Sequence, residues 1–163
     1  VCTVLASNML MLCHGWDEAY ARAQVQEAVS SGRAFAQMKR WVAAQGGDPA
    51  VLDDTSKLPQ AAIRQEILAP RGGYLSHMDA QKIGEASALL GAGRRTKEDS
   101  IDFAAGIVLQ KKTGDLVHPG DVLAVLHTNQ PDTLPAAEQT FLSALRWADS
   151  APAPQPLILD IVR

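Results

Sequence analysis

The chain has 163 residues, of which 47% are apolar and 20% are charged, and its formal net charge at pH 7 is −3. This length suits one or two small hydrophobic cores, and the composition is that of an ordinary folded protein. The slight acidity excludes a strongly basic surface for nucleic acid. Because no apolar run reaches the roughly 20 residues that span a bilayer, we expect neither nucleic acid nor a membrane as a partner.

The N-terminal residues 1–13 are apolar at all but three positions, and we expect them to form a helix that is buried on all sides. Cys2 and Cys13 would lie about 16 Å apart on that helix, which is too far for a disulfide bond. We therefore expect two buried thiols, as in a cytoplasmic protein. The sequence has neither a starting Met nor a basic leading segment, so we expect the chain to begin inside a helix of a larger protein.

Two further helices are predicted in the first third of the chain. One begins at Asp17, because acids are favourable near the positive end of a helix, and it ends at Gly32. The next carries Met38 and Trp41 at helical spacing and stops before Gly46. Both large side chains are expected to fill a core.

Residues 50–62 are predicted to form a loop that leads to a domain boundary near Ala62, and short strands then alternate with turns. Gly and Asp at 114–115 and 120–121 mark tight turns, because they accept positive φ values and local hydrogen bonds. The predicted strands are residues 63–68, 74–76, 107–109, 116–117, 122–126 and 157–162, and the predicted helices are residues 80–90 and 134–149.

Residues 91–129 are the most informative segment, with the sequence GAGRRTKEDSIDFAAGIVLQKKTGDLVHPGDVLAVLHTN. A charged run near its start is the candidate site, because arginine presents a planar fork suited to phosphate and lysine adds a mobile charge. The alternative is a solvated loop whose cations are offset by its own carboxylates and that of Asp102. The candidate residues are Arg94, Arg95, Lys97, Glu98 and Asp99.

Other catalytic and metal-binding patterns are absent from the sequence. The four histidines lack the spacing of metal ligands, and no G-x-S-x-G nucleophile turn occurs. Gly91 and Gly93 do not form a G-x-G-x-x-G motif and follow a predicted helix instead of a strand. We therefore expect no metal-binding and no cofactor-binding residue in this chain.

The segment 91–129 resembles the C-terminal region of the pyrimidine-nucleoside phosphorylases, the family that includes thymidine phosphorylase. Two earlier blocks, VAAQGGDP at 42–49 and APRGGY at 69–74, resemble the same family in the same order. The sequence departs from the family at Gly72, where Ser is common, and at Gln110, where His is common.

The resemblance implies a mixed α/β (α+β) fold in two parts. Residues 1–62 would be a helical segment that completes a larger lobe, and residues 63–163 would form an α/β-hammerhead-like C-terminal domain. The implied activity is cleavage of pyrimidine nucleosides (uridine, thymidine and deoxyuridine) by phosphate, which yields the free base and (deoxy)ribose 1-phosphate. The form KEDSIDFAAGIVLQKK is similar to the branch of broad pyrimidine specificity.

The resemblance also implies where the chemistry lies. The catalytic residues of the family precede the position that matches Val1, so no catalytic residue is carried over, and this chain alone is expected to be inactive. The charged run at 94–99 would lie toward the mouth of the cleft and support a lid. The parent enzyme would use phosphate as co-substrate, bind potassium, form a cytoplasmic homodimer, and supply its N-terminal part as the partner of this chain.

Two alternatives stay open. The spacing of the two Gly-Asp turns resembles half of a biotinyl or lipoyl carrier domain, so the chain could be a non-catalytic hammerhead or barrel-sandwich scaffold or binding module. Such carriers attach their cofactor to a lysine at a hairpin tip, whereas Lys111 and Lys112 precede the first turn. The chain could also be a proteolytic remnant whose own core suffices for folding.

Overall fold

The computed structural model describes residues 1–94, 96–154 and 156–162. The chain forms two compact units: one contains Val1–Lys57 with the segment that follows Pro154, and the other is Leu58–Pro154. The division into domains at Ala62 stays a prediction, because contacts within one chain do not define the domains of a longer protein. Within the described ranges, the structure contains no helix long and apolar enough to cross a membrane.

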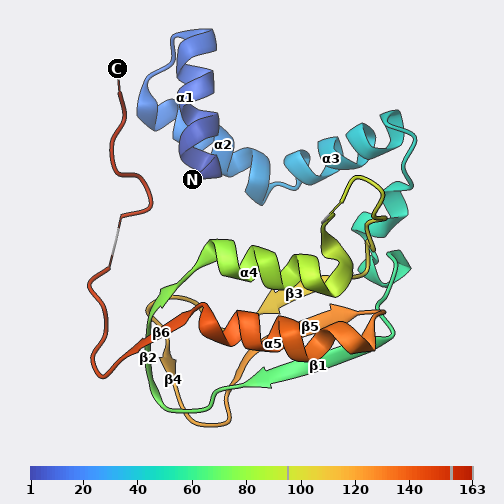
Figure 1. Cartoon of the computed structure of the whole chain (residues 1–163). Helices are drawn as coiled ribbons and strands as arrows, with labels where there is room; N and C mark the ends of the chain where they lie inside the picture. The colour runs from blue at the N-terminus through green and yellow to red at the C-terminus, as the bar shows by residue number, and fades with distance from the viewer. Residues whose placement is uncertain (95, 155, 163) are drawn as a thin grey trace. The chain divides into compact units, whose positions relative to one another are not determined.

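The first unit is helical (Figure 1). The carboxylate of Asp17 accepts a hydrogen bond from the Tyr20 amide and so caps the second helix, as the sequence predicts. Gly32, with φ of 78°, separates the second helix from the third in a left-handed conformation that suits glycine. The elements are α1 (Cys2–His14), α2 (Glu18–Ser30), α3 (Arg33–Ala44), η1 (Pro49–Leu52) and η2 (Thr55–Lys57).

Helix α1 is not buried on all sides, contrary to the prediction. Leu12 is 86% exposed and Met9 is 65% exposed, whereas Ser7 is the residue of α1 that is buried. Cys2 and Cys13 are free and exposed, so the prediction of two buried thiols is also wrong. The physical reason is that α1 packs mainly on α2 within this unit, so the rest of its circumference has no neighbouring element to bury it.

Helix α3 exposes the side chains that were predicted to fill a core. Trp41 is 61% exposed, Met38 is 44% exposed, and Phe35 is 45% exposed with Lys39 Nζ lying 4.9 Å from its ring centroid. The helical spacing was read correctly, but the described unit brings no apolar layer against this face. The prediction that Met38 and Trp41 are core residues is therefore wrong for this chain.

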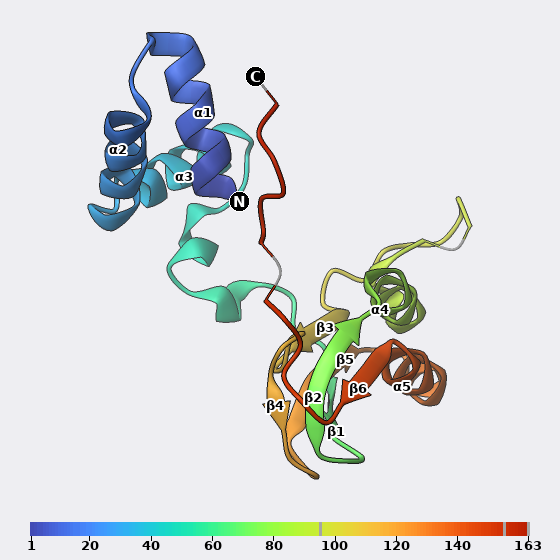
Figure 2. The same cartoon turned by 90° about the vertical axis from the view of Figure 1, so that its left-hand side faces the viewer.

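The second unit contains two small antiparallel sheets and two helices, the mixed α/β fold that the sequence predicts (Figures 1 and 2). Strand β5 is central in the first sheet: Ile67 of β1 and Leu109 of β3 both face its Ala124. The first sheet has the order β1 (Ile63–Leu68), β5 (Val122–Thr128), β3 (Gly106–Leu109), and the second has the order β4 (Leu116–Val117), β2 (Gly73–Met78), β6 (Leu145–Ala148).

Helices α4 (Ala80–Ser87) and α5 (Leu134–Ser143) lie side by side on one side of the strands (Figures 1 and 2). Asp79 caps α4 by accepting hydrogen bonds from the Gln81 and Lys82 amides. One core joins both sheets and both helices, because apolar residues at alternate strand positions meet the helix faces. Its fully buried large side chains are Ile67, Leu75, Leu90, Val117, Leu123, Leu126 and Phe141.

Two predicted elements of this unit and one beyond it differ in the structure. Residues 80–90 are not one α-helix, because a π-helical turn, η3 (Ala88–Ala92), follows α4. Residues 134–149 are divided between α5 and strand β6. In β6, Trp147 pairs with Leu75 of β2. Residues 157–162, which follow the second unit, form no strand and are largely exposed.

Candidate functional site

The candidate site lies where η3 leads into the charged loop of residues 92–101. Gly91 has φ of 108°, and a Cβ there would lie 3.3 Å from Gln130 Nε2 and 3.4 Å from Asp102 Cβ. The backbone conformation therefore favours glycine, whereas the space would admit a Cβ after a small shift of the Gln130 side chain. The Asp102 amide donates a 2.9 Å hydrogen bond to the Gly91 carbonyl and closes the loop at its base.

The end of β5 and the residue that follows it hold both ends of this loop. The Thr128 hydroxyl, which is fully buried, donates a 2.7 Å hydrogen bond to the Leu90 carbonyl in η3, just before the loop. The Asn129 side-chain amide donates a 2.8 Å hydrogen bond to the Asp102 carboxylate at its end. The loop is thus anchored on a central strand of the core.

Within the loop, Asp99 organises the backbone. Its carboxylate accepts hydrogen bonds from the Thr96 amide at 2.9 Å and from the Thr96 hydroxyl at 2.8 Å. This arrangement uses a short polar side chain to replace backbone partners in a turn. A structural role for the carboxylate follows directly from these contacts.

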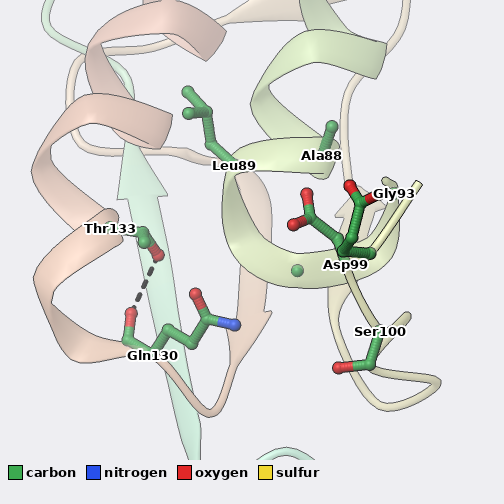
Figure 3. A pocket seen from close by; sticks show the side chains of 9 residues that line it. Ala88, Leu89, Gly93, Asp99, Ser100, Gln130 and Thr133 are labelled. Atoms are coloured by element: carbon green, nitrogen blue, oxygen red, sulfur yellow. Dashed lines mark hydrogen bonds between the residues drawn. The ribbon is translucent and has the colours of Figure 1, made fainter. Parts of the chain in front are cut away.

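An open pocket of about 430 Å³ lies between this loop and the start of α5 (Figure 3). Figure 3 shows Asp99 on one side of the pocket and Gln130 with Thr133 on the other, where the Thr133 hydroxyl donates a hydrogen bond to the Gln130 carbonyl. The pocket therefore combines carboxylates with amide and hydroxyl groups. The full lining is Ala88, Leu89, Gly91, Gly93, Glu98, Asp99, Ser100, Gln130 and Thr133.

The structure brings together only part of the predicted charged run. Glu98 and Asp99 line the pocket, whereas Arg94 and Lys97 are exposed and are not among its lining residues. Arg95 lies outside the described residues. Because two carboxylates line the pocket, its chemistry suits hydroxyl or amine groups and opposes the phosphate that the arginines first suggested.

The sequence analysis missed Ser100, Gln130 and Thr133 as pocket residues and Thr128 and Asn129 as the anchors of the loop. The only signal in the sequence was the polar stretch that directly follows a predicted strand. That stretch gives no indication of which distant residues it contacts.

The two predicted Gly-Asp turns form as expected and fix nearby charges. Asp121 accepts a hydrogen bond from the His118 amide and pairs with Lys111 at 3.1 Å, and these contacts, led by the backbone one, lower the pKa of its carboxyl. On β5, partial burial of the His127 ring lowers its pKa, and the nearby Arg64 adds to this effect.

In the described part of the chain, no three His, Cys, Asp or Glu side chains lie close enough together to hold a metal ion. His14 stacks on Trp16 with ring centroids 4.6 Å apart, and His77 and His118 are exposed. These three histidines therefore lie at the surface, and His127 lies next to the last residue of β5.

Comparisons with known proteins place this chain in a family. Residues 74–148 match the family described as the pyrimidine nucleoside phosphorylase C-terminal domain. The chain is 41% identical, over 93% of its length, to a pyrimidine-nucleoside phosphorylase of Bacillus subtilis (strain 168). It is 44% identical, over 78% of its length, to one of Staphylococcus aureus (strain USA300). The chain spans about a third of the length of these curated relatives, 35% and 30% respectively.

Proposed function

Because residues 74–148 form a pyrimidine nucleoside phosphorylase C-terminal domain, we propose that this chain is the C-terminal part of an enzyme that cleaves pyrimidine nucleosides with phosphate. The observation that carries the proposal is the identity of 41–44% to relatives of that name over most of this chain. The proposed substrates are uridine, thymidine and deoxyuridine, and the products are the free base and (deoxy)ribose 1-phosphate.

In the proposed reaction, a phosphate oxygen forms a bond to the anomeric carbon of the sugar while the bond from that carbon to the base nitrogen breaks. The base leaves with the bonding electron pair and takes up one proton. Donors that stabilise the negative charge on the departing base, and groups that hold phosphate in line, would lower the barrier. We assign these roles to the part of the enzyme that precedes the matched segment, and to no residue of this chain.

The role proposed for this chain is to form one edge of the cleft mouth. The loop 92–101 is anchored at both ends on the core, by Thr128 and Asn129, while Arg94 and Lys97 extend into solvent. A loop with a rigid base and an exposed charged tip is suited to support a lid without taking part in the chemistry.

Phosphate is proposed as co-substrate and potassium as an ion of the parent enzyme. The described residues include no cluster of three His, Cys, Asp or Glu side chains, and we place the potassium site in the part of the enzyme that precedes the matched segment. We therefore assign no step of the reaction to potassium.

We further propose a homodimeric, cytoplasmic enzyme in which the N-terminal part of the same protein is the partner of this chain. Free, exposed thiols at Cys2 and Cys13 suit a reducing compartment. The exposed apolar faces of α1 and α3 would be covered by that partner, because patches of this kind mark interaction surfaces.

A carrier role receives no support from the lysines. Lys111 forms an ion pair with Asp121 at 3.1 Å, with 26% of its side chain exposed, so it is not presented for modification at a hairpin tip. Lys112 lies at the start of the turn, where its amide donates to the Asp115 carboxylate. The enzyme proposal therefore stands ahead of the carrier alternative.

The proposal is tested by assaying uridine, thymidine and deoxyuridine cleavage with two preparations, the 163-residue chain alone and the longer protein that contains it. We expect phosphate-dependent release of uracil and thymine from the longer protein and none from the chain alone. Phosphate-dependent cleavage by the purified chain would refute the assignment of the chemistry to another part of the enzyme. Inactivity of the longer, folded protein on all three nucleosides would refute the enzyme proposal.

A further inference from the structure

The side chain of Asn129 joins two segments that are distant in the sequence. Its Oδ1 accepts a 2.8 Å hydrogen bond from the Ala62 amide, 67 residues earlier. Its Nδ2 donates a 2.8 Å hydrogen bond to Asp102 Oδ2, 27 residues earlier. One planar amide group therefore holds both segments at once, and its orientation cannot change without affecting both contacts.

Asp102 is the residue through which the charged loop is fixed. Its amide donates to the Gly91 carbonyl at 2.9 Å, and its own carbonyl accepts from the Ala105 amide at 3.1 Å. Its Oδ1 accepts from the Ala104 amide at 2.9 Å, which leaves Oδ2 to receive the Asn129 amide. A displacement of Asp102 would therefore move the backbone at Gly91, before the loop, and at Ala104 and Ala105, after it.

Ala62 occupies the other end of the bridge, directly before β1 and close after Lys57, the last residue of the first unit before the second begins. The contact from Asn129 fixes the backbone just where the chain enters the first sheet. A change in the direction of this entering segment would move the Ala62 amide, and with it the Asn129 side chain.

We propose that Asn129 is a positioning residue that couples the segment leading into β1 at Ala62 to the base of the charged loop at Asp102. Asparagine suits this position because its side chain presents an acceptor and a donor at once, whereas aspartate would present only acceptors. Movement of the entering segment is thereby transmitted to the loop 92–101. The coupling is a property of the folded chain, and only its effect on turnover rests on the proposed function.

The test is amide hydrogen exchange by NMR on the 163-residue chain without any substrate, so its result does not depend on enzyme activity. Asn129→Asp keeps the acceptor for the Ala62 amide but places a carboxylate opposite Asp102. Asp102→Ala removes the loop end of the bridge and leaves Asn129 in place. Thr133→Ala is the matched control, because it deletes a nearby side-chain hydrogen bond that is local to Gln130.

We expect Asp102→Ala to raise the exchange rate of the Ala62 amide about three- to tenfold, the loss that one hydrogen bond corresponds to. Asn129→Asp should raise exchange at the Asp102 and Ala104 amides by a similar factor while Ala62 stays protected. The proposal is overturned if Ala62 exchanges at the wild-type rate in Asp102→Ala, if Asn129→Asp leaves the loop amides unchanged, or if Thr133→Ala produces the same increases. If Asp102→Ala fails to fold, Asn129→Asp still tests whether Asn129 holds the base of the loop. If Asn129→Asp fails to fold, Asp102→Ala still tests whether loss of the loop end reaches Ala62.

Discussion

The Thr128 hydroxyl donates a 2.7 Å hydrogen bond to the Leu90 carbonyl across 38 residues of sequence, and both residues are fully buried. The same hydroxyl oxygen accepts a hydrogen bond from the Gln130 amide at 3.0 Å. We predict that Thr128→Val, which keeps the shape but loses both contacts, destabilises the second unit by about 1–3 kcal/mol. Urea unfolding followed by tryptophan fluorescence measures this change in the free energy of unfolding, since Trp147 lies in that unit.

The matched control for this prediction is Thr140→Val, because the Thr140 hydroxyl makes one local hydrogen bond to the Ala136 carbonyl within α5. Its cost should stay within about 0.5 kcal/mol. Equal losses for the two variants would show that the buried contact at Leu90 does not anchor the loop.

Two phenylalanines, one buried and one exposed, allow the stability contribution of core packing to be compared with that of a surface side chain. Phe141 of α5 is fully buried, whereas Phe103 is 84% exposed on the loop before β3. Phe141→Ala should cost about 3–5 kcal/mol through lost burial and the cavity left behind, and Phe103→Ala should cost less than about 0.5 kcal/mol in the isolated chain. Denaturant unfolding of both variants checks the pair, and a large loss for Phe103→Ala would show that the core extends under the loop.

The pKa of His127 is lowered from 6.5, first by burial of its ring and then by Arg64. The unfolded chain therefore binds the proton at a higher pH than the folded chain. Stability conferred by the neutral imidazole is present above pH 6.5 and is lost as the pH falls from 6.5 to the folded-state pKa. An NMR titration should give a value below 6.5 for His127, raised partly but not fully by Arg64→Gln, and a wild-type value at or above 6.5 would contradict the assignment.

The two Gly-Asp turns offer a matched comparison of carboxylates. Asp121 and Asp115 each accept a backbone amide hydrogen bond, but Asp121 also pairs with Lys111. The pKa of Asp121 is lowered from 3.8, so its stabilising effect is present above pH 3.8 and is lost as the pH falls through the folded-state value. We expect Asp121→Asn to lose more stability at pH 7 than Asp115→Asn.

Because the excess loss in Asp121→Asn comes from an ion pair at the surface, it should shrink when the salt concentration rises from about 0.05 M to about 1 M. Thermal unfolding of both variants at the two salt concentrations measures this excess loss of stability. An excess that does not change with salt would assign the difference to packing of the turn and not to Lys111.

The strands of the second unit could be predicted from the sequence because local patterns determine them. β1 was predicted with its observed bounds, and β3 and β5 were predicted to within two residues, since the short apolar runs of β3 and β5 are bounded by Gly, Pro and Asp. The end of α5 could not be predicted in this way. Leu145 continues the helical spacing of Phe141, so the sequence gives no sign that the helix ends there. Only pairing with β2 selects the strand.

The candidate site was predictable only in part. The charged run stands out in the sequence, but its anchors, Thr128 and Asn129, contact it across 38 and 27 residues, and such pairings are set by the fold. The exposure of Met38 and Trp41 has a related cause. Helical spacing predicts which residues share a face, whereas only tertiary structure decides whether another element covers that face.

The central claim, a role in phosphorolysis, is tested most directly by identifying the sugar product. The longer protein that contains this chain is incubated with uridine and inorganic phosphate, and the reaction is followed by ³¹P NMR. We predict a sugar 1-phosphate signal that grows in step with free uracil and disappears when phosphate is omitted. Release of uracil with free ribose and no sugar phosphate would show hydrolysis instead and would contradict the account.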